Sequence, residues 1–150
     1  MTQESATDDE LADVVRRARL SASALIAGDI PGYLAEIEHS HDYTLMSPFG
    51  GDPERGFDGS AERLAAISDF FQGGEAEVEV VASYATGDLV VLVVIERQHG
   101  RVGGLPDQDL SLRVTMVFRR TESGWEQVHR HADPLVHGIA LEQLAELLRG

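Results

Sequence analysis

Apolar residues recur at helical spacing in two segments near the start of this chain. The first segment follows Thr7-Asp-Asp-Glu10, a sequence typical of a capping box, and Gly28 is expected to end it. The second is short, begins after Asp29 and carries Pro31 in its first turn. We expect it to end near the polar cluster His39-Ser-His41-Asp42, whose histidines would then satisfy helix-terminal carbonyls or take part in catalysis.

A loop rich in glycine and proline over residues 47–59 precedes a third helical segment over residues 60–72. Gly73-Gly74 is expected to terminate that helix. The loop carries two aromatic residues, Phe49 and Phe57, which suggests that it folds against apolar surface.

Alternating apolar and polar positions then replace the helical spacing. Strands are expected over residues 43–46, 77–85, 89–98, 109–120 and 125–133, and a final helix over 141–148. Helices followed by a meander of long strands predict an α+β domain in which the helices cover one face of an antiparallel sheet. One such domain is expected over residues 1–150, with a polar tail at 1–6 and the C-terminal helix within 139–150.

The run Leu89–Ile95 has no polar position, so both of its faces should be covered. The helices would cover one face, and a second copy of the chain the other, which predicts a homodimer. In the strand 109–120, parity places Leu112 and Val114 on one face and Arg113 and Thr115 on the other. Period two does not say which of these faces lines the interior, so the apolar face can be ordinary core with Arg113 exposed.

The formal net charge of −14 disfavours binding to nucleic acid or to anionic membranes. The chain has no cysteine, which excludes disulfides and thiolate metal sites, and its first residues lack the basic and apolar regions of a signal peptide. The longest apolar run is too short to span a bilayer as a helix. We therefore expect a cytoplasmic protein.

Four stretches carry a family resemblance. They are Gly87-Asp88 before an apolar strand, Ile95-Glu96-Arg97, the strand from Arg113 to Arg120, and the run Trp125–Asp133. With the order of the elements, they resemble the nuclear transport factor 2-like superfamily over roughly residues 8–135. The resemblance is narrower to SnoaL-like and ketosteroid-isomerase-like proteins, and extends to the association domain of calmodulin-dependent kinase.

The resemblance implies a cone, in which a strongly bent sheet wraps a long helix and its open end holds a pocket for a small, often apolar molecule. Comparison with the kinase domain would direct Glu96, Arg113 and Arg130 into the cavity and put His129 and His131 on the outer, dimer-facing side. The reactions known in this fold are proton transfers on a bound molecule, such as isomerisation, cyclisation or dehydration. None needs a cofactor.

The candidate site residues are titratable or aromatic groups near the expected cavity. Glu96, Arg113 and His41 are the catalytic candidates, and the ligand-binding candidates are Tyr33, Phe49, Phe57, Thr115, Arg130 and His129. Glu96 and Arg113 are expected to pair in an apolar cavity, where they would polarise a carbonyl or enolate; equally, they can be a structural ion pair. A histidine beside an acid, as in His41-Asp42, can serve as a general base with its orienting group.

His129-x-His131 with Asp133 has the residue types of a two-histidine, one-carboxylate metal site. Paired histidines on a sheet more often make hydrogen bonds, so we expect no metal. The sequence therefore predicts a small-molecule pocket that is used either for acid–base catalysis or for ligand binding and association without catalysis.

Overall fold

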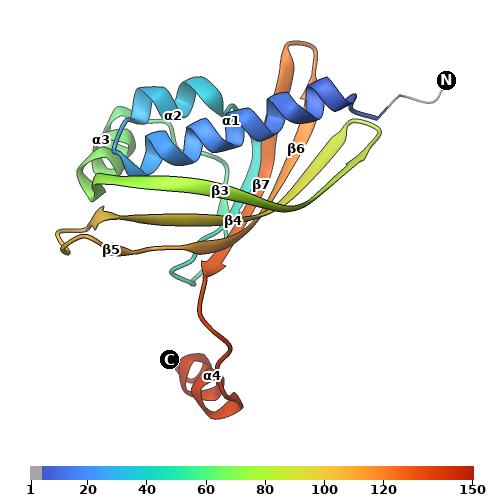
Figure 1. The fold of residues 1–150 in the computed structure, drawn as a ribbon. Helices are drawn as coiled ribbons and strands as arrows, with labels where there is room; N and C mark the ends of the chain where they lie inside the picture. Colours follow the sequence, from blue (N-terminus) through green and yellow to red (C-terminus); the bar gives the residue numbers. More distant parts are fainter. Residues whose placement is uncertain (1–4) are drawn as a thin grey trace.

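The computed structural model describes residues 5–150, so residues 1–4 of the expected polar tail lie outside the described residues (Figure 1). The helices are α1 (Asp8–Ile26), α2 (Ile30–Glu36), α3 (Ala61–Phe70) and α4 (Leu141–Leu148). The strands are β1 (His39–Met46), β2 (Glu54–Arg55), β3 (Phe71–Thr86), β4 (Leu89–Val102), β5 (Gln108–Asp109), β6 (Leu112–Thr121) and β7 (Gly124–Pro134).

Local capping explains where the first two helices begin. The side chain of Thr7 accepts a hydrogen bond from the backbone of Glu10, whose carboxylate returns one to the backbone of Thr7, which confirms the capping box. Asp29 caps α2 by accepting from the backbone N–H of Gly32. Gly28 follows α1 with a φ of 79°, a conformation that favours glycine and ends the helix as expected.

The strands form one curved sheet in the order β2-β1-β7-β6-β4-β3, and β5 pairs with β4. The described pairs are antiparallel except β1 with β7, which run parallel. Figure 1 shows α1 and α2 on one side of this sheet, which bends around α1. The predicted α+β cone is therefore confirmed.

The core lies between α1 and the inner face of the sheet. Val90, Leu92 and Val94 of β4 are at most 2% exposed, and they pack in one cluster with Val14 and Ala18 of α1. The inner residues of β6 in this cluster are Val114, Met116 and Phe118. Burial of each large apolar side chain contributes roughly 1.5–3 kcal/mol to the free energy of unfolding.

The inner face of β6 is thus the apolar one, and the prediction that Arg113 faces the cavity is wrong. Arg113 is exposed on the outer face, where its register partner on β4 is Ile95. Thr115 shares that face and pairs with Val93 and His131 of the flanking strands. The alternation of side chains along β6 separated its two faces correctly, but the face that carries Arg113 and Thr115 is the outer one.

Two boundaries also differ from the sequence prediction. Gly73-Gly74 does not end α3; the helix ends at Phe70 and the glycines belong to β3, where the pairing with β4 shifts between Phe71 and Gly74. The second correction concerns His39, which is not at a helix end but opens β1, two residues after Ile37 caps α2. Strand pairing with β7 overrides the local pattern there.

A β-bulge interrupts the last strand. Val117 of β6 pairs with His129 and the next residue, Phe118, pairs with Gln127, so Val128 is the extra residue. Without the bulge, alternation would put Gln127 and His129 on one face and Arg130 on the other. Because of the bulge, Gln127 and Arg130 both face inward. Gln127 is 3% exposed, and Arg130 pairs with the buried Glu96.

The C-terminal helix α4 forms where it was expected, but it stands away from the rest of the molecule. Figure 1 shows it at the end of an extended segment that follows β7, away from α1 and α2. Among the described residues, no helix is long and apolar enough to cross a membrane.

Candidate functional site

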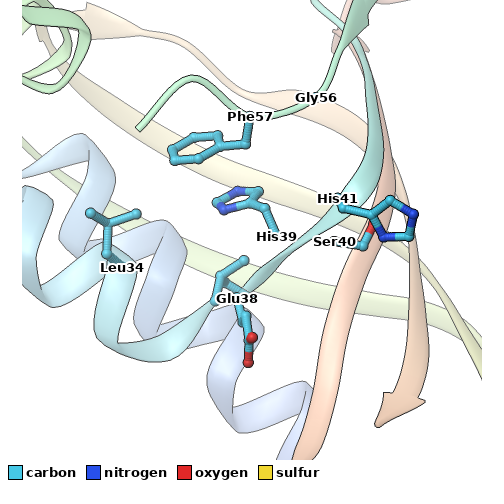
Figure 2. Close-up of a pocket in the computed structure, with 8 residues that line it drawn as sticks. Leu34, Glu38, His39, Ser40, His41, Gly56 and Phe57 are labelled. Atoms are coloured by element: carbon cyan, nitrogen blue, oxygen red, sulfur yellow. The ribbon is translucent and has the colours of Figure 1, made fainter. Parts of the chain in front are cut away.

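An open pocket of about 400 Å³ lies between α2, β1 and the loop that follows β2 (Figure 2). It is lined by Leu34, Ile37, Glu38, His39, Ser40, His41, Gly56 and Phe57. The loop is held against β1 because the backbone N–H of Gly56 donates to the carbonyl of Tyr43. Its volume falls within the range of small-molecule sites, and its lining mixes apolar with polar side chains.

His39 forms the centre of this pocket. Its ring stacks on Phe57 with centroids 3.8 Å apart and an interplanar angle of 3°, and Figure 2 shows the two rings face to face. Tyr43 meets the same imidazole edge-on at 4.7 Å. On the far side, Nε2 of His39 shares a hydrogen bond of 3.0 Å with the hydroxyl of Tyr33. The imidazole is thus fixed by three aromatic neighbours from α2, β1 and the loop.

Burial and charge keep His39 neutral. Desolvation and, to a smaller extent, the positive charge of Arg130 together lower the pKa of His39 to about 4. Burial also raises the pKa of Tyr33 and of Tyr43, so both hydroxyls stay protonated. At neutral pH the pocket wall therefore carries an uncharged imidazole bonded to an uncharged phenol.

Behind these aromatic residues lies an ion pair between β4 and β7. Arg130 Nη2 lies 2.7 Å from Glu96 Oε1, and Nη1 lies 2.8 Å from Oε2, a bidentate geometry. The side chains are 18% and 4% exposed. Burial opposes the charge of Arg130, but attraction to Glu96 outweighs it and raises the pKa of the guanidinium. Glu96 was expected to form an ion pair with Arg113 in the interior. Glu96 does form an interior ion pair, but its partner is Arg130.

The remaining ligand-binding candidates and the catalytic candidate His41 are divided between the pocket and the surface. Phe57 and His41 line the pocket, and Tyr33 lies behind His39. Phe49 is 82% exposed, lies edge-on to Phe70 and is not among the lining residues. His129 lies on the outer side, where Nδ1 makes a 2.7 Å hydrogen bond with the hydroxyl of Thr44.

The expected pairing of His41 with Asp42 does not form. Asp42 instead accepts two hydrogen bonds from Arg119, at 2.9 and 3.2 Å, and these bonds lower the pKa of its carboxyl. Figure 2 shows the ring of His41 directed away from that of His39. His41 therefore lacks the carboxylate that would orient a general base.

From the sequence, His39 was expected only as one of two histidines at a helix end, and Tyr43 was not expected in the site. The missed signal is the β-strand character of the segment from His39 to Met46, which brings two aromatic rings together at its start. For metal binding, no group of three or more potential ligand side chains occurs among residues 5–150. His131 Nε2 and Asp133 lie 3.4 Å apart, both about half exposed.

The comparisons with known proteins agree with this fold. None of the curated proteins matches this chain. Among solved structures, a candidate dehydratase of the nuclear transport factor 2-like family from Streptomyces avermitilis is 19% identical, with a TM-score of 0.67 over 88% of this chain and 100% of that one. A candidate scytalone dehydratase from Novosphingobium aromaticivorans is 13% identical, with a TM-score of 0.69 over 88% and 90% of the two chains.

The resemblance to the kinase association domain is found as well. The CamKII hub homology domain of Chlamydomonas reinhardtii is 18% identical, with a TM-score of 0.61 over 84% of this chain and 98% of that one. These identities show a shared fold. A family model described as the SnoaL-like domain matches residues 20–136, which include the pocket and the whole sheet. This chain belongs to the SnoaL-like domain family.

Proposed function

We propose that this protein binds a small, mainly apolar organic molecule in the pocket beside His39 and transfers a proton on it without a cofactor. The observation that carries the proposal is the neutral imidazole of His39, fixed by Tyr33 and Phe57 at the wall of the pocket. Reactions of this class are isomerisation, cyclisation and dehydration, which need a proton acceptor and a hydrogen-bond donor held beside the bound molecule.

In the proposed reaction, Nδ1 of His39 meets the ligand. Nε2 is bonded to Tyr33, and Nδ1 has no hydrogen-bond partner among residues 5–150. The lone pair on Nδ1 takes a proton from carbon next to a carbonyl group, while Nε2–H donates to the oxygen of Tyr33. The imidazolium then returns the proton to another carbon or to a departing hydroxyl group. A pKa of about 4 makes the imidazolium a good acid for this second step.

The proposal is tested by hydrogen–deuterium exchange. A panel of cyclic ketones and hydroxylated aromatic ketones is incubated with the protein in D₂O, and deuterium at the carbon next to the carbonyl is measured by NMR. We expect exchange with at least one compound, and a loss of roughly 100-fold or more in His39→Gln. His99→Gln, which changes an exposed histidine outside the pocket, is the matched control and should keep full activity.

A second candidate function is ligand binding without catalysis. One observation favours it: Glu96 and Arg130, the charged groups nearest the interior, satisfy each other in a bidentate pair. Saturable binding of a panel compound, seen as a shift of the His39 ring signals without any deuterium exchange, would establish this function and exclude the catalytic one.

We further infer that the protein is a homodimer formed through the outer face of the sheet. Val91, Val93 and Ile95 of β4 point to that face and are only partly buried, although the strand has no polar position between Leu89 and Ile95. An apolar outer face is typical of a subunit contact. Sedimentation velocity at micromolar concentration should give twice the 16.3 kDa mass of the chain.

A further inference from the structure

The pocket beside His39 lies along one edge of the strand β1. Five consecutive residues of its lining, 37–41, run from the end of α2 into this strand. On this side of β1 the neighbouring strand is β2, which pairs with Thr44 and Leu45 and not with the start of the strand. The first residues of β1 therefore have an open edge, and the pocket lies against it (Figure 2).

The pairing of β1 with β7, on its other side, is interrupted in the same segment. Along β1 the register passes directly from His39 to Thr44, so residues 40–43 have no partner in β7. The same residues have no register partner in β2. Among the described residues, the backbone N–H and C=O of His41 are therefore not taken up by the ladder of the sheet.

Two hydrogen bonds indicate which way this N–H points. The carbonyl of Glu38 faces β7, because it accepts from the backbone N–H of Gln127 at 2.7 Å. The carbonyl of Tyr43 faces the opposite edge, because it accepts from the backbone N–H of Gly56 at 2.6 Å. The N–H and C=O of one strand residue point to the same edge, and successive residues alternate between the two edges. From either end, alternation directs the N–H of His41 to the edge that the pocket follows.

Side-chain contacts agree with this alternation. The rings of His39 and Tyr43 meet at 4.7 Å in the interior, whereas Asp42 bonds to Arg119 of the outer face. Residues of β1 therefore alternate regularly from His39 to Tyr43, and the interruption in the pairing with β7 does not reverse the direction of the His41 N–H.

Gly56 explains why the edge stays open. Its φ of 78° is a conformation that favours glycine, and it turns the chain away from β1 directly after β2. The next residue, Phe57, then stacks on the ring of His39 instead of continuing the ladder along β1. The pocket between β1 and this loop thus contains the imidazole of His39 and, two residues further along the strand, a backbone hydrogen-bond donor.

We propose that the backbone N–H of His41 binds the carbonyl oxygen of the ligand while Nδ1 of His39 faces the carbon beside that carbonyl. The inference rests on the proposed function and names the hydrogen-bond donor that the reaction needs. Two residues along a strand span roughly 7 Å, and a carbonyl group with its neighbouring carbon fits between donor and acceptor when each contact is about 3 Å. As the C–H bond breaks, its proton goes to Nδ1 and its electron pair forms a C=C bond, which moves the carbonyl π pair onto oxygen. The N–H stabilises this oxyanion, so the ligand is a ketone or ester with a hydrogen on that carbon.

The first test compares two substitutions of His41. Proline removes the N–H, and a strand tolerates it at an edge position outside the ladder; alanine removes the imidazole and keeps the N–H. Deuterium exchange is measured with α-tetralone and the other ketones of the panel. The fastest-exchanging ketone should react at least roughly 100-fold more slowly with His41→Pro than with His41→Ala. Equal rates in the two variants overturn the role of the N–H, while a loss in His39→Gln still supports the proposed function. No exchange by wild type overturns both.

A second test uses the unaltered chain and decides the matter if His41→Pro does not fold. The six histidines are labelled with nitrogen-15, and the amide signal of His41 is assigned by its absence in His41→Ala. Saturation with the fastest-exchanging ketone should move this amide proton downfield and slow its exchange with solvent. The hydrocarbon of the same ring system, tetralin for α-tetralone, should do neither. A ketone that shifts the His39 ring signals but leaves the His41 amide unmoved overturns the inference.

Discussion

Arg130 and Glu96 form a bidentate ion pair in the interior of the cone, at 2.7 and 2.8 Å, between two strands that are not neighbours in the sheet. The pair lies behind the pocket wall, where the charge of Arg130 also lowers the pKa of His39. A buried ion pair contributes little net stability compared with an apolar pair of the same size, but loss of one partner leaves a buried charge unpaired.

Arg130→Met should therefore lower the free energy of unfolding by roughly 3–5 kcal/mol. The double variant Arg130→Met with Glu96→Leu should recover much of this loss, because it leaves no unpaired charge. Urea denaturation followed by circular dichroism measures both. The matched control is Arg113→Met, which changes an exposed arginine on the outer face and should stay within about 0.5 kcal/mol of wild type. Equal losses in the two arginine variants would contradict the placement of Arg130 inside and Arg113 outside.

Stability should fall in mild acid because of His39. Its pKa is about 4 in the folded protein and 6.5 in an ordinary environment. Below pH 6.5 the unfolded chain therefore takes up a proton that the folded chain does not, and the folded state loses up to roughly 3 kcal/mol by pH 4. Above pH 6.5 the residue is neutral in both states and contributes no pH dependence.

The measurement is the free energy of unfolding at pH 7, 6, 5 and 4 for wild type and for His39→Gln. The difference between the two curves should grow in favour of the variant as the pH falls. His99 provides the opposite case, since Asp107 and Glu75 raise its pKa and stabilise the folded state at low pH. His99→Gln should therefore steepen the acid decline, and parallel curves for His39→Gln and wild type would refute the buried, neutral state of His39.

The sequence predicts the elements that are determined locally. The capping box at Thr7, the cap at Asp29 and the stop at Gly28 depend only on neighbouring residues, and all three form. The apolar run Leu89–Ile95 likewise predicts a central strand, because no polar position interrupts it. These features and the alternation of the later strands were enough to predict an α+β domain with helices on one face of an antiparallel sheet, whereas the cone was implied by the family resemblance.

The site was harder to predict because it depends on register. One extra residue, Val128, turns Arg130 to the same side of the sheet as Gln127, and no rule of alternation shows where a bulge will occur. The pairing of β1 with β7 similarly places His39 in a strand rather than at a helix end. The choice between Arg113 and Arg130 as the partner of Glu96 rests on such non-local pairings.

Arg120 connects the start of α1 to two later parts of the chain. Its guanidinium bonds to Glu10 and, at 3.2 Å, to Asp88 in the turn between β3 and β4, and it lies 4.8 Å from the centre of the Trp125 ring. We expect Arg120→Gln to cost about 1–2 kcal/mol, more than an isolated surface pair, because several contacts are lost together. Urea denaturation measures this, and the emission of Trp125, the chain's single tryptophan, should shift. The control Arg16→Gln, which removes an exposed pair with Asp13, should have little effect on either measurement.

Gly74 lies where β3 passes under the end of α1, and it has no room for a side chain. A Cβ atom there would lie 2.3 Å from the carbonyl oxygen of His99, 2.7 Å from the Cα of Gly100 and 2.9 Å from a side-chain carbon of Ile26. Two of these neighbours are backbone atoms of the paired strand, and Ile26 is only 2% exposed, so none can move aside without disturbing the core.

Gly74→Ala should therefore destabilise the protein by roughly 1–3 kcal/mol. Thermal and urea denaturation measure the loss. Gly138→Ala is the matched control, because no atom lies within 4 Å of its Cβ position and its φ is not positive; it should stay within about 0.5 kcal/mol of wild type. Equal stability of the two alanine variants would contradict the close approach of β3 to β4 and α1 at Gly74.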